Sequence, residues 1–319
     1  MMPEQMIRWA RWARSEPWIW SWLATLGVWL ATIAFTQGRG SGEVLTAALV
    51  FATFTVIVGL GQMMVVTLGP GNVDLSIPGT IALAGCAAMK LTDSENPLLL
   101  VGILAALGIG VAVGMFNYGL IRLLRIPPII ATLSTSFIVQ SAAIAYGRGI
   151  RIKPAPMLAD FATARILGVP VLAMVVALGS IVIGIALARS RFGRSVLAIG
   201  QNMRAARLAG IAVDRTRLAT YVLSAVLASI CGVVLSGFSG GAALDMGDEY
   251  LLASIAVVVI GGTSVAGGKA NVPGIWGAAI FMYLLVTMLN TFGASPGIRL
   301  IMTGVIIIGV ILVAGGEEQ

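Results

Sequence analysis

Long apolar runs separated by short polar breaks constrain this chain more than any single motif does. Most of these runs approach or exceed the roughly 20 residues that an α-helix needs to cross the hydrocarbon of a bilayer. Because 58% of the residues are apolar and only 10% are charged, the chain could not cover a water-soluble surface. The sequence predicts an all-α integral membrane protein with about ten transmembrane helices, at 18–36, 44–68, 76–89, 98–120, 128–146, 166–188, 218–238, 250–264, 273–292 and 298–314.

Two of the ten runs, 76–89 and 250–264, are too short to cross a bilayer as straight helices, so we expect them to be tilted, re-entrant or partly irregular. The whole of 18–314 is predicted to be a single membrane domain, followed by a cytoplasmic tail at 315–319. Residues 1–17 precede it as an amphipathic segment suited to the membrane interface. This segment does not resemble a secretory signal, because the run that follows it is long enough to span.

The positively charged residues give the orientation. If 1–17 is cytoplasmic, the inner segments hold thirteen of the twenty lysines and arginines, and the outer ones hold most of the loop acids. Both termini are then cytoplasmic. The ten spans divide into two sets of five, and because five is an odd number, two similar halves would have opposite orientations. Membrane topology therefore explains the net charge of +7 better than a nucleic-acid partner does.

The segment 189–217 is the longest polar stretch between spans, and it holds seven of the basic residues. Asn202 is predicted to cap a short helix that ends at Leu208 or Ala209, and Gly210 is predicted to stop it in a left-handed conformation. Met203, Ala206 and Ala209 recur at helical spacing beside Arg204 and Arg207, so one face can be buried and the other offered to a partner. A basic loop resting on anionic headgroups is the alternative. The candidate contact residues are Asn202, Arg204, Ala205, Ala206, Arg207, Leu208, Ala209 and Gly210.

A break at 69–76 interrupts an apolar region with Gly, Pro, Asn and Asp residues, which lipid-exposed backbone could not accommodate. It is predicted to lie inside the protein or at a water-filled surface. Asp74 either holds the irregular backbone together or contacts a transported solute. We take Asn72, Asp74 and Ser76 as candidates for a translocation pathway.

A second break, at 261–271, superficially resembles a phosphate-binding loop, but the spacing of such a loop fails twice. Its glycines instead favour a tight cytoplasmic turn and close helix packing. The chain has no histidine, and Cys86 and Cys231 both lie in apolar runs. No metal site, nucleotide site or set of catalytic side chains is predicted, which argues against a membrane-embedded enzyme. An ion-coupled transporter or channel would need acids or histidines within the membrane, and only Asp74 qualifies.

The fifth run carries polar side chains on one helical face. Thr132, Ser136 and Gln140 are four residues apart, with Thr135 beside them, whereas Leu133 and Phe137 point elsewhere. Hydrogen bonding between helices would explain this stripe. The alternative, which we prefer because a carboxamide is easier to accommodate beside water, is that the stripe lines a wet channel between two copies of the chain.

Several motifs together resemble the permease family of ribose-type ABC importers, which also includes branched-chain amino acid permeases. They are VDLS (73–76), PPIIATL (127–133), FGR (192–194), AIGQN (198–202), AARLAGI (205–211) and AGGK (266–269), in this order. The chain departs from the family at Asn72, where glycine is common, and at 77–79, where Ile-Pro-Gly replaces a Val-Gly-Ser type of sequence. Asparagine also tolerates positive φ, so the turn can survive.

The resemblance implies a type II importer: two ten-helix permeases around a central pathway, two cytoplasmic ATPases that bind ATP and magnesium, and a soluble binding protein outside. It implies a bacterial inner membrane, the coupling of residues 202–210 to the ATPase, and no cofactor on this chain. The expected cargo is a monosaccharide, with a branched-chain amino acid or a nucleoside as the alternative. For the binding protein we consider the oppositely charged outer segments 147–165 and 239–249, although solvated loops would look the same. Their candidate residues are Arg151, Lys153, Asp245, Asp248 and Glu249.

Overall fold

A computed structural model describes residues 18–38, 41–149 and 152–291, together with scattered positions between 293 and 309. The predicted amphipathic segment 1–17, most of the predicted span 298–314 and the tail 315–319 lie outside the described residues. Arg151 lies outside them too.

Most of the described structure is helical. Seven of them are long and apolar enough to cross a membrane: α2 (Trp18–Phe35), α3 (Ser41–Val66), α5 (Leu99–Leu123), α6 (Pro128–Gly147), α8 (Val171–Arg189), α11 (Val213–Ser239) and α13 (Val272–Thr291). Two shorter apolar helices, α4 (Ile77–Thr92) and α12 (Glu249–Ile260), coincide with the two short predicted runs. The chain is therefore an all-α, multi-pass membrane protein, as predicted.

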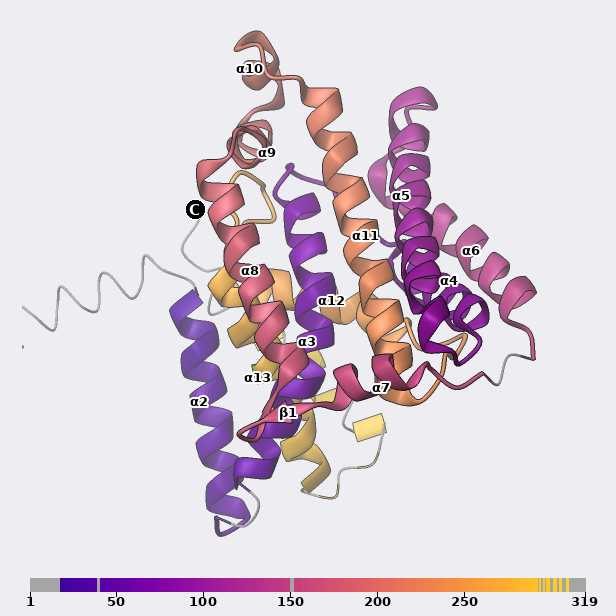
Figure 1. Cartoon of the computed structure of the whole chain (residues 1–319). Helices are drawn as coiled ribbons and strands as arrows, with labels where there is room; N and C mark the ends of the chain where they lie inside the picture. The colour runs from indigo at the N-terminus through magenta and orange to yellow at the C-terminus, as the bar shows by residue number, and fades with distance from the viewer. Residues whose placement is uncertain are drawn as a thin grey trace, which may run out of the picture.

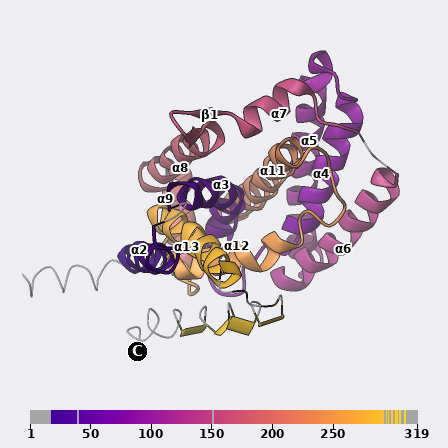
Figure 2. The same cartoon turned by 90° about the horizontal axis from the view of Figure 1, so that it is seen from below.

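Helix α11 lies in the middle of the bundle. It packs against α5 and α4 on one side and against α3 on the other, as Figures 1 and 2 show. Small residues allow this close approach: a Cβ atom on Gly114 of α5 would collide with the backbone of Val222 on α11. Since lipid tails are as apolar as leucine, close packing of this kind is what holds helices together in a bilayer.

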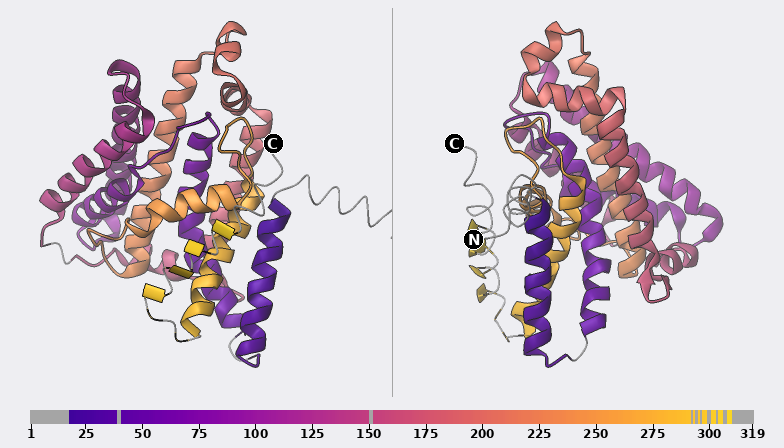
Figure 3. Two further views of the ribbon diagram at one scale, coloured as in Figure 1. Left: turned by 180° about the vertical axis from the view of Figure 1, so that it is seen from behind. Right: turned by 90° about the vertical axis from the view of Figure 1, so that its left-hand side faces the viewer.

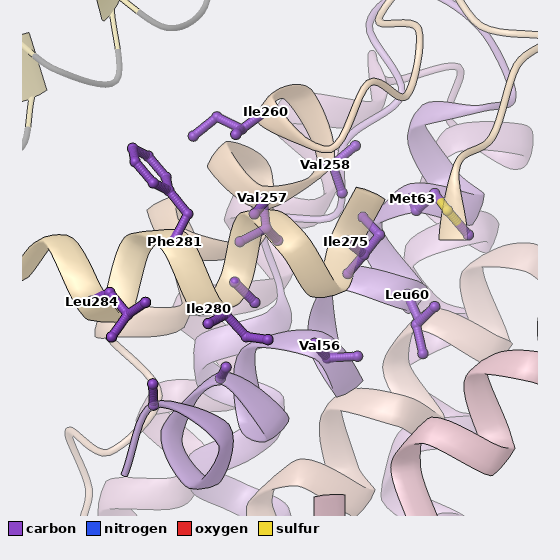
Figure 4. Close-up of a cluster of buried hydrophobic side chains, with 14 of the residues drawn as sticks. Val56, Leu60, Met63, Val257, Val258, Ile260, Ile275, Ile280, Phe281 and Leu284 are labelled. Carbon is purple, nitrogen blue, oxygen red and sulfur yellow. The ribbon is translucent and has the colours of Figure 1, made fainter. Parts of the chain in front are cut away.

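The largest cluster of buried apolar side chains joins α3 to α12 and α13 (Figure 4). Val56 and Leu60 of α3 contribute to it, as do Val257 of α12 and Ile275 and Leu284 of α13. All five side chains are at most 2% exposed. This cluster fixes α12, which is too short to span alone, within the longer helices.

The connecting segments gather at two opposite ends of the molecule (Figures 1 and 3). Two short helices, α9 (Arg191–Gln201) and α10 (Met203–Leu208), lie at one end. At the other end lie α7 (Pro156–Thr163) and a small hairpin of β1 (Arg165–Ile166) and β2 (Val169–Pro170), in which Arg165 pairs with Pro170. The turn η1 (Asn96–Leu98) precedes α5. The segments predicted to be cytoplasmic and external thus fall at different ends.

Two helix starts differ from the prediction, and one helix was not predicted. Helix α8 begins at Val171 rather than at 166, because the preceding residues form the hairpin. Helix α11 begins at Val213 rather than at 218, so Asp214 and Arg217 lie on the helix and not in a loop. The helix α9 was not predicted, although Ser190 caps it by accepting a hydrogen bond of 3.0 Å from the Gly193 N–H.

Candidate functional site

The break between α3 and α4 is irregular backbone whose polar side chains are buried in the bundle, while Pro70 and Gly71 are exposed at its tip. Gly69 and Gly71 have φ angles of 115° and 76°, a conformation that other residues rarely adopt. Asn72, Asp74 and Ser76 are at most 5% exposed. Because non-helical backbone at membrane depth is tolerated only within protein or beside water, these polar groups must find partners in the chain.

The Asp74 carboxylate is the centre of the hydrogen bonds that organise the break. Its Oδ1 accepts from the Ser76 N–H at 3.0 Å and from the Ser76 hydroxyl at 2.6 Å, and its Oδ2 accepts from the Ser224 hydroxyl of α11 at 2.7 Å. The Asp74 N–H donates to Gln62 Oε1 of α3 at 3.1 Å, and Asn117 of α5 donates to Ser76 Oγ at 2.8 Å. Asp74 and Ser76 together thus tie the break to three helices, α3, α5 and α11.

Thr132 connects the same break to α6. Its hydroxyl accepts from the Leu75 N–H at 3.0 Å, and its single proton lies between two carbonyl acceptors, Val73 at 3.1 Å and Pro128 at 2.9 Å. This links the irregular backbone to a fourth helix. Thr132 is fully buried, and so is Thr135, whose hydroxyl donates to the Ala131 carbonyl at 2.9 Å.

The polar stripe of α6 faces the inside of the bundle and not its open surface. Thr132, Thr135 and Ser136 lie on the side that packs against α4, and Leu133 and Phe137 are the exposed ones, at 38% and 66%. The stripe therefore does not form an open wall in this conformation. The physical reason is that the Thr132 and Thr135 hydroxyls are satisfied within the chain, while the apolar face suits lipid or another protein.

Gln140 extends the stripe away from the break, toward the segment between α11 and α12. Its Nε2 donates to the Leu244 carbonyl at 2.6 Å, which joins α6 to the segment between α11 and α12. Its Oε1 is buried and has no hydrogen-bond partner among the described residues. Gln140 is only partly buried as a whole, unlike Thr132 and Thr135.

The predicted short helix in the polar segment is α10, and its ends are as predicted. The Asn202 side chain accepts from the Ala205 N–H at 2.9 Å, and Gly210 has a φ angle of 82°. Ala206 is 5% exposed and belongs to a buried apolar cluster with Val196 and Ile199 of α9, whereas Leu208 is 85% exposed. The free face of α10 consists of Arg204, Ala205, Arg207, Leu208 and Ala209.

Three distant backbone segments meet beside α10. The Gly268 N–H donates to the Thr67 carbonyl at 2.9 Å, so the loop after α12 touches the start of the break. Gly200, near the end of α9, lies so close that a Cβ atom there would collide with the Thr67 carbonyl and with Gly268. Gly267 likewise contacts Gly69. The glycines of 261–271 thus provide a tight turn and close packing, as predicted.

Comparison with known proteins places this architecture in a family. The family model described as "Branched-chain amino acid transport system / permease component" matches residues 44–311. The chain belongs to this permease family. This confirms the resemblance to permeases of ribose-type ABC importers.

Three relatives of this permease are each 30% identical to it. The ribose import permease protein RbsC of Escherichia coli K12 aligns over 82% of either chain. The autoinducer 2 import system permease protein LsrC of Enterobacter sp. strain 638 aligns over 94% of this chain and 87% of its own length. The corresponding LsrD protein of Escherichia coli K12 aligns over 80% and 79%. No solved structure shows a significant match.

A cluster of charged groups at the start of α11 in this permease was not predicted. Asp214 accepts from the Tyr118 hydroxyl at 2.8 Å and pairs with Arg122 Nε of α5 at 3.1 Å. Arg207 of α10 lies 3.9 Å from the same carboxylate. The sequence signal was an acid at helical spacing from Arg217, but its partners come from two other helices and cannot be read locally.

At the opposite end of the permease, the predicted outer charges are accessible. Lys153 is exposed, and so are Asp245, Asp248 and Glu249, which lie just before or at the start of α12. Within the described part of the chain, no group of three or more His, Cys, Asp or Glu residues could hold a metal ion.

Proposed function

We propose that this chain is the translocation subunit of an ABC importer that brings a monosaccharide, ribose first among the candidates, into the cytoplasm by alternating access. The observation that carries this proposal is the match to the family over 44–311, together with a ribose import permease that aligns over 82% of the chain. Autoinducer 2 is the second candidate cargo, because two of the relatives are permeases of its import system.

The proposal includes the arrangement of the complex. A second permease copy would face this one, two ATPases would bind ATP and magnesium on the cytoplasmic side, and a soluble binding protein would deliver the cargo from outside. The membrane would be the bacterial inner membrane, with both termini in the cytoplasm and ten spans in two inverted halves. The gathering of 189–217 at one end and of α7 and the hairpin at the other supports this orientation.

The docking site for the ATPase is assigned to α10 and its caps. A capped helix whose exposed face carries Leu208, at 85% exposure, and Arg204 and Arg207 presents an apolar anchor with a basic rim. We take this face as a protein contact because a few residues carry most of the binding energy of an interface, arginine is enriched among them, and Leu208 adds apolar surface that docking would bury. Exposed ion pairs of the arginines would add only about 0 to 1 kcal/mol each.

The translocation pathway is assigned to the polar layer between the break and α6. It comprises Asn72, Asp74, Ser76, Thr132, Thr135, Ser136 and Gln140. Because Thr132 is buried here and bonds to the break, the layer would meet the cargo only when α6 and α4 separate during the cycle. The four exposed outer residues Lys153, Asp245, Asp248 and Glu249 are assigned to the binding protein, and Arg151 joins them by proposal alone.

Reconstitution tests the function. The permease is inserted into proteoliposomes together with its cognate ATPase. ATP is enclosed in the lumen, the binding protein and radiolabelled D-ribose are added outside, and uptake of the ribose is measured. ATP-dependent uptake of ribose, with no uptake of leucine or adenosine, is expected. Uptake of leucine or adenosine instead would assign a different cargo, and uptake driven by an ion gradient without the ATPase would overturn the proposal.

A further inference from the structure

Asn72 is the point at which the break is joined to α11. Its Oδ1 accepts two hydrogen bonds of 3.1 Å, from Arg217 Nη2 and from the Tyr221 hydroxyl. Its Nδ2 donates to the Gly69 carbonyl at 3.0 Å, so the side chain also closes the turn of the break. The Asn72 side chain is 5% exposed, so its hydrogen bonds are made to groups of the protein and not to water.

The charges around Asn72 explain why an amide is suited to this position. Arg217 lies over the Tyr118 ring, 5.7 Å from its centroid, and the ion pairs found among the described residues involve Asp214 and not Arg217 or Asp74. A partly buried guanidinium without a carboxylate requires strong neutral acceptors. Glycine, which is common in the family at position 72, would offer no side-chain acceptor. Asn72 instead supplies the oxygen to which Arg217 and Tyr221 donate.

The other end of this connection reaches α10. Asp214 lies three residues before Arg217 on α11, and it contacts Arg207 of α10 at 3.9 Å and Tyr118 of α5 at 2.8 Å. A displacement of α10 would therefore act on the first turns of α11. Since α11 is one continuous helix from Val213 to Ser239, its first turns carry Arg217 and Tyr221 with them.

We propose that Asn72 is a positioning residue that makes the break follow α11 when the ATPase moves α10. The proposal rests on the proposed function, because it requires an ATPase at α10. The proposal concerns only how the motion of α10 reaches the polar side chains around Asp74. The motion changes non-covalent contacts and involves no covalent chemistry. Adjacency alone does not establish coupling between two sites, so the experiment must measure the response of one to the other.

The readout is a fluorophore on the break that needs no cargo. Pro70, which is exposed and two residues from Asn72, is replaced by cysteine in a background of Cys86→Ala and Cys231→Ala, and is labelled with an environment-sensitive dye. The full complex of permease and ATPase receives a non-hydrolysable ATP analogue. We expect a change in dye emission with Asn72 present, and loss of that change in Asn72→Leu.

Two further variants keep the test decisive. Asn72→Leu leaves the Arg217 guanidinium without its acceptor and can impair assembly, so the double variant Asn72→Leu/Arg217→Met removes acceptor and cation together and should show the same loss. The control is Thr220→Val, next to Tyr221, because the Thr220 hydroxyl donates only to its own helix, at the Thr216 carbonyl. This control should respond like the parent.

The outcomes separate this inference from the proposed function. If the ATPase does not co-purify with the parent chain, the docking role of α10 is wrong. If the ATPase binds and hydrolyses ATP but the parent dye does not respond, or responds equally in the Asn72 variants, the inference is overturned while the function stands.

Discussion

The hydroxyl of Ser224 on α11 donates a 2.7 Å hydrogen bond to the Asp74 carboxylate, 150 residues away in the sequence. Both groups are at most 1% exposed. An acid at membrane depth is costly unless its oxygens are satisfied, so this contact decides whether the break can stay buried. It also places the break on the same helix that receives contacts from α10.

Removing this contact should destabilise the permease. Ser224→Ala leaves Asp74 Oδ2 without the Ser224 donor, and hydrogen bonds to charged groups contribute about 1.5 to 3 kcal/mol. We expect a clear drop in the thermal midpoint of the purified protein. The matched control is Ser229→Ala on the same helix, because the Ser229 hydroxyl donates only to the Val226 carbonyl. Equal midpoints for the two variants would contradict the central role of Asp74.

The backbone junction beside α10 gives a second prediction. Gly200→Ala would place a methyl group against the Thr67 carbonyl and Gly268, and since both neighbours are backbone, neither can move cheaply. The yield and thermal midpoint of the protein should fall. Gly179→Ala in α8, where an added Cβ meets nothing within 4 Å, should instead be neutral or stabilising by up to about 1 kcal/mol, because alanine favours a helix over glycine. If both variants behave alike, the junction is looser than described.

How far the sequence predicts this structure depends on how local each feature is. The caps at Asn202 and Gly210 were predictable, because a helix end is decided by residues within one turn. The stripe of Thr132, Ser136 and Gln140 was predictable as a face, but helical spacing does not say which neighbour covers that face, and α4 covers it here.

The contacts of α11 could not be predicted for a related reason. From the sequence alone, Ser224 would be taken as a small packing residue, but the fold brings it to Asp74. Asp214 would likewise be taken as a loop acid, but residues of α5 and α10 pair with it. Apolar length predicted the seven long helices and the two shorter ones among the described residues, whereas partners that are far apart in the chain are set by the packing of whole helices.

The polar layer of α6 should become accessible only during transport. In a background of Cys86→Ala and Cys231→Ala, Thr132→Cys should not react with a small water-soluble thiol reagent in the resting permease, because position 132 is fully buried. If α6 and α4 separate during the cycle, the reaction should appear when ATP and the binding protein are added. Leu133→Cys is the control, because position 133 is already exposed and its reactivity should not depend on ATP and the binding protein. A cysteine at 132 that stays unreactive during turnover would place the pathway on another surface.

The exposed face of α10 can be tested without disturbing its fold. Ala206→Glu would bury a charge within the permease itself, so it reports on folding and is a poor probe of docking. Leu208→Glu alters only the exposed anchor and should reduce co-purification of the ATPase about tenfold or more, which corresponds to at least 1.4 kcal/mol. Leu167→Glu is the control, because Leu167 is 100% exposed in the hairpin at the opposite end. Unchanged ATPase binding in Leu208→Glu would remove α10 from the docking site.

The outer acids give a prediction about the binding protein. Asp245→Lys and Asp248→Lys together reverse two exposed charges ahead of α12. Glu249 lies in the first turn of α12, where a negative charge favours the helix by about 0.3 to 1 kcal/mol, so Glu249→Gln is the gentler change. Basal ATPase activity of the complex should stay the same, and its stimulation by the binding protein should fall, most strongly at low salt, because exposed charges are screened as ionic strength rises. Glu95→Lys, an exposed position between α4 and α5 at the same end, controls for a general change in surface charge. Full stimulation of the altered complex at low salt would mean that the binding protein docks elsewhere.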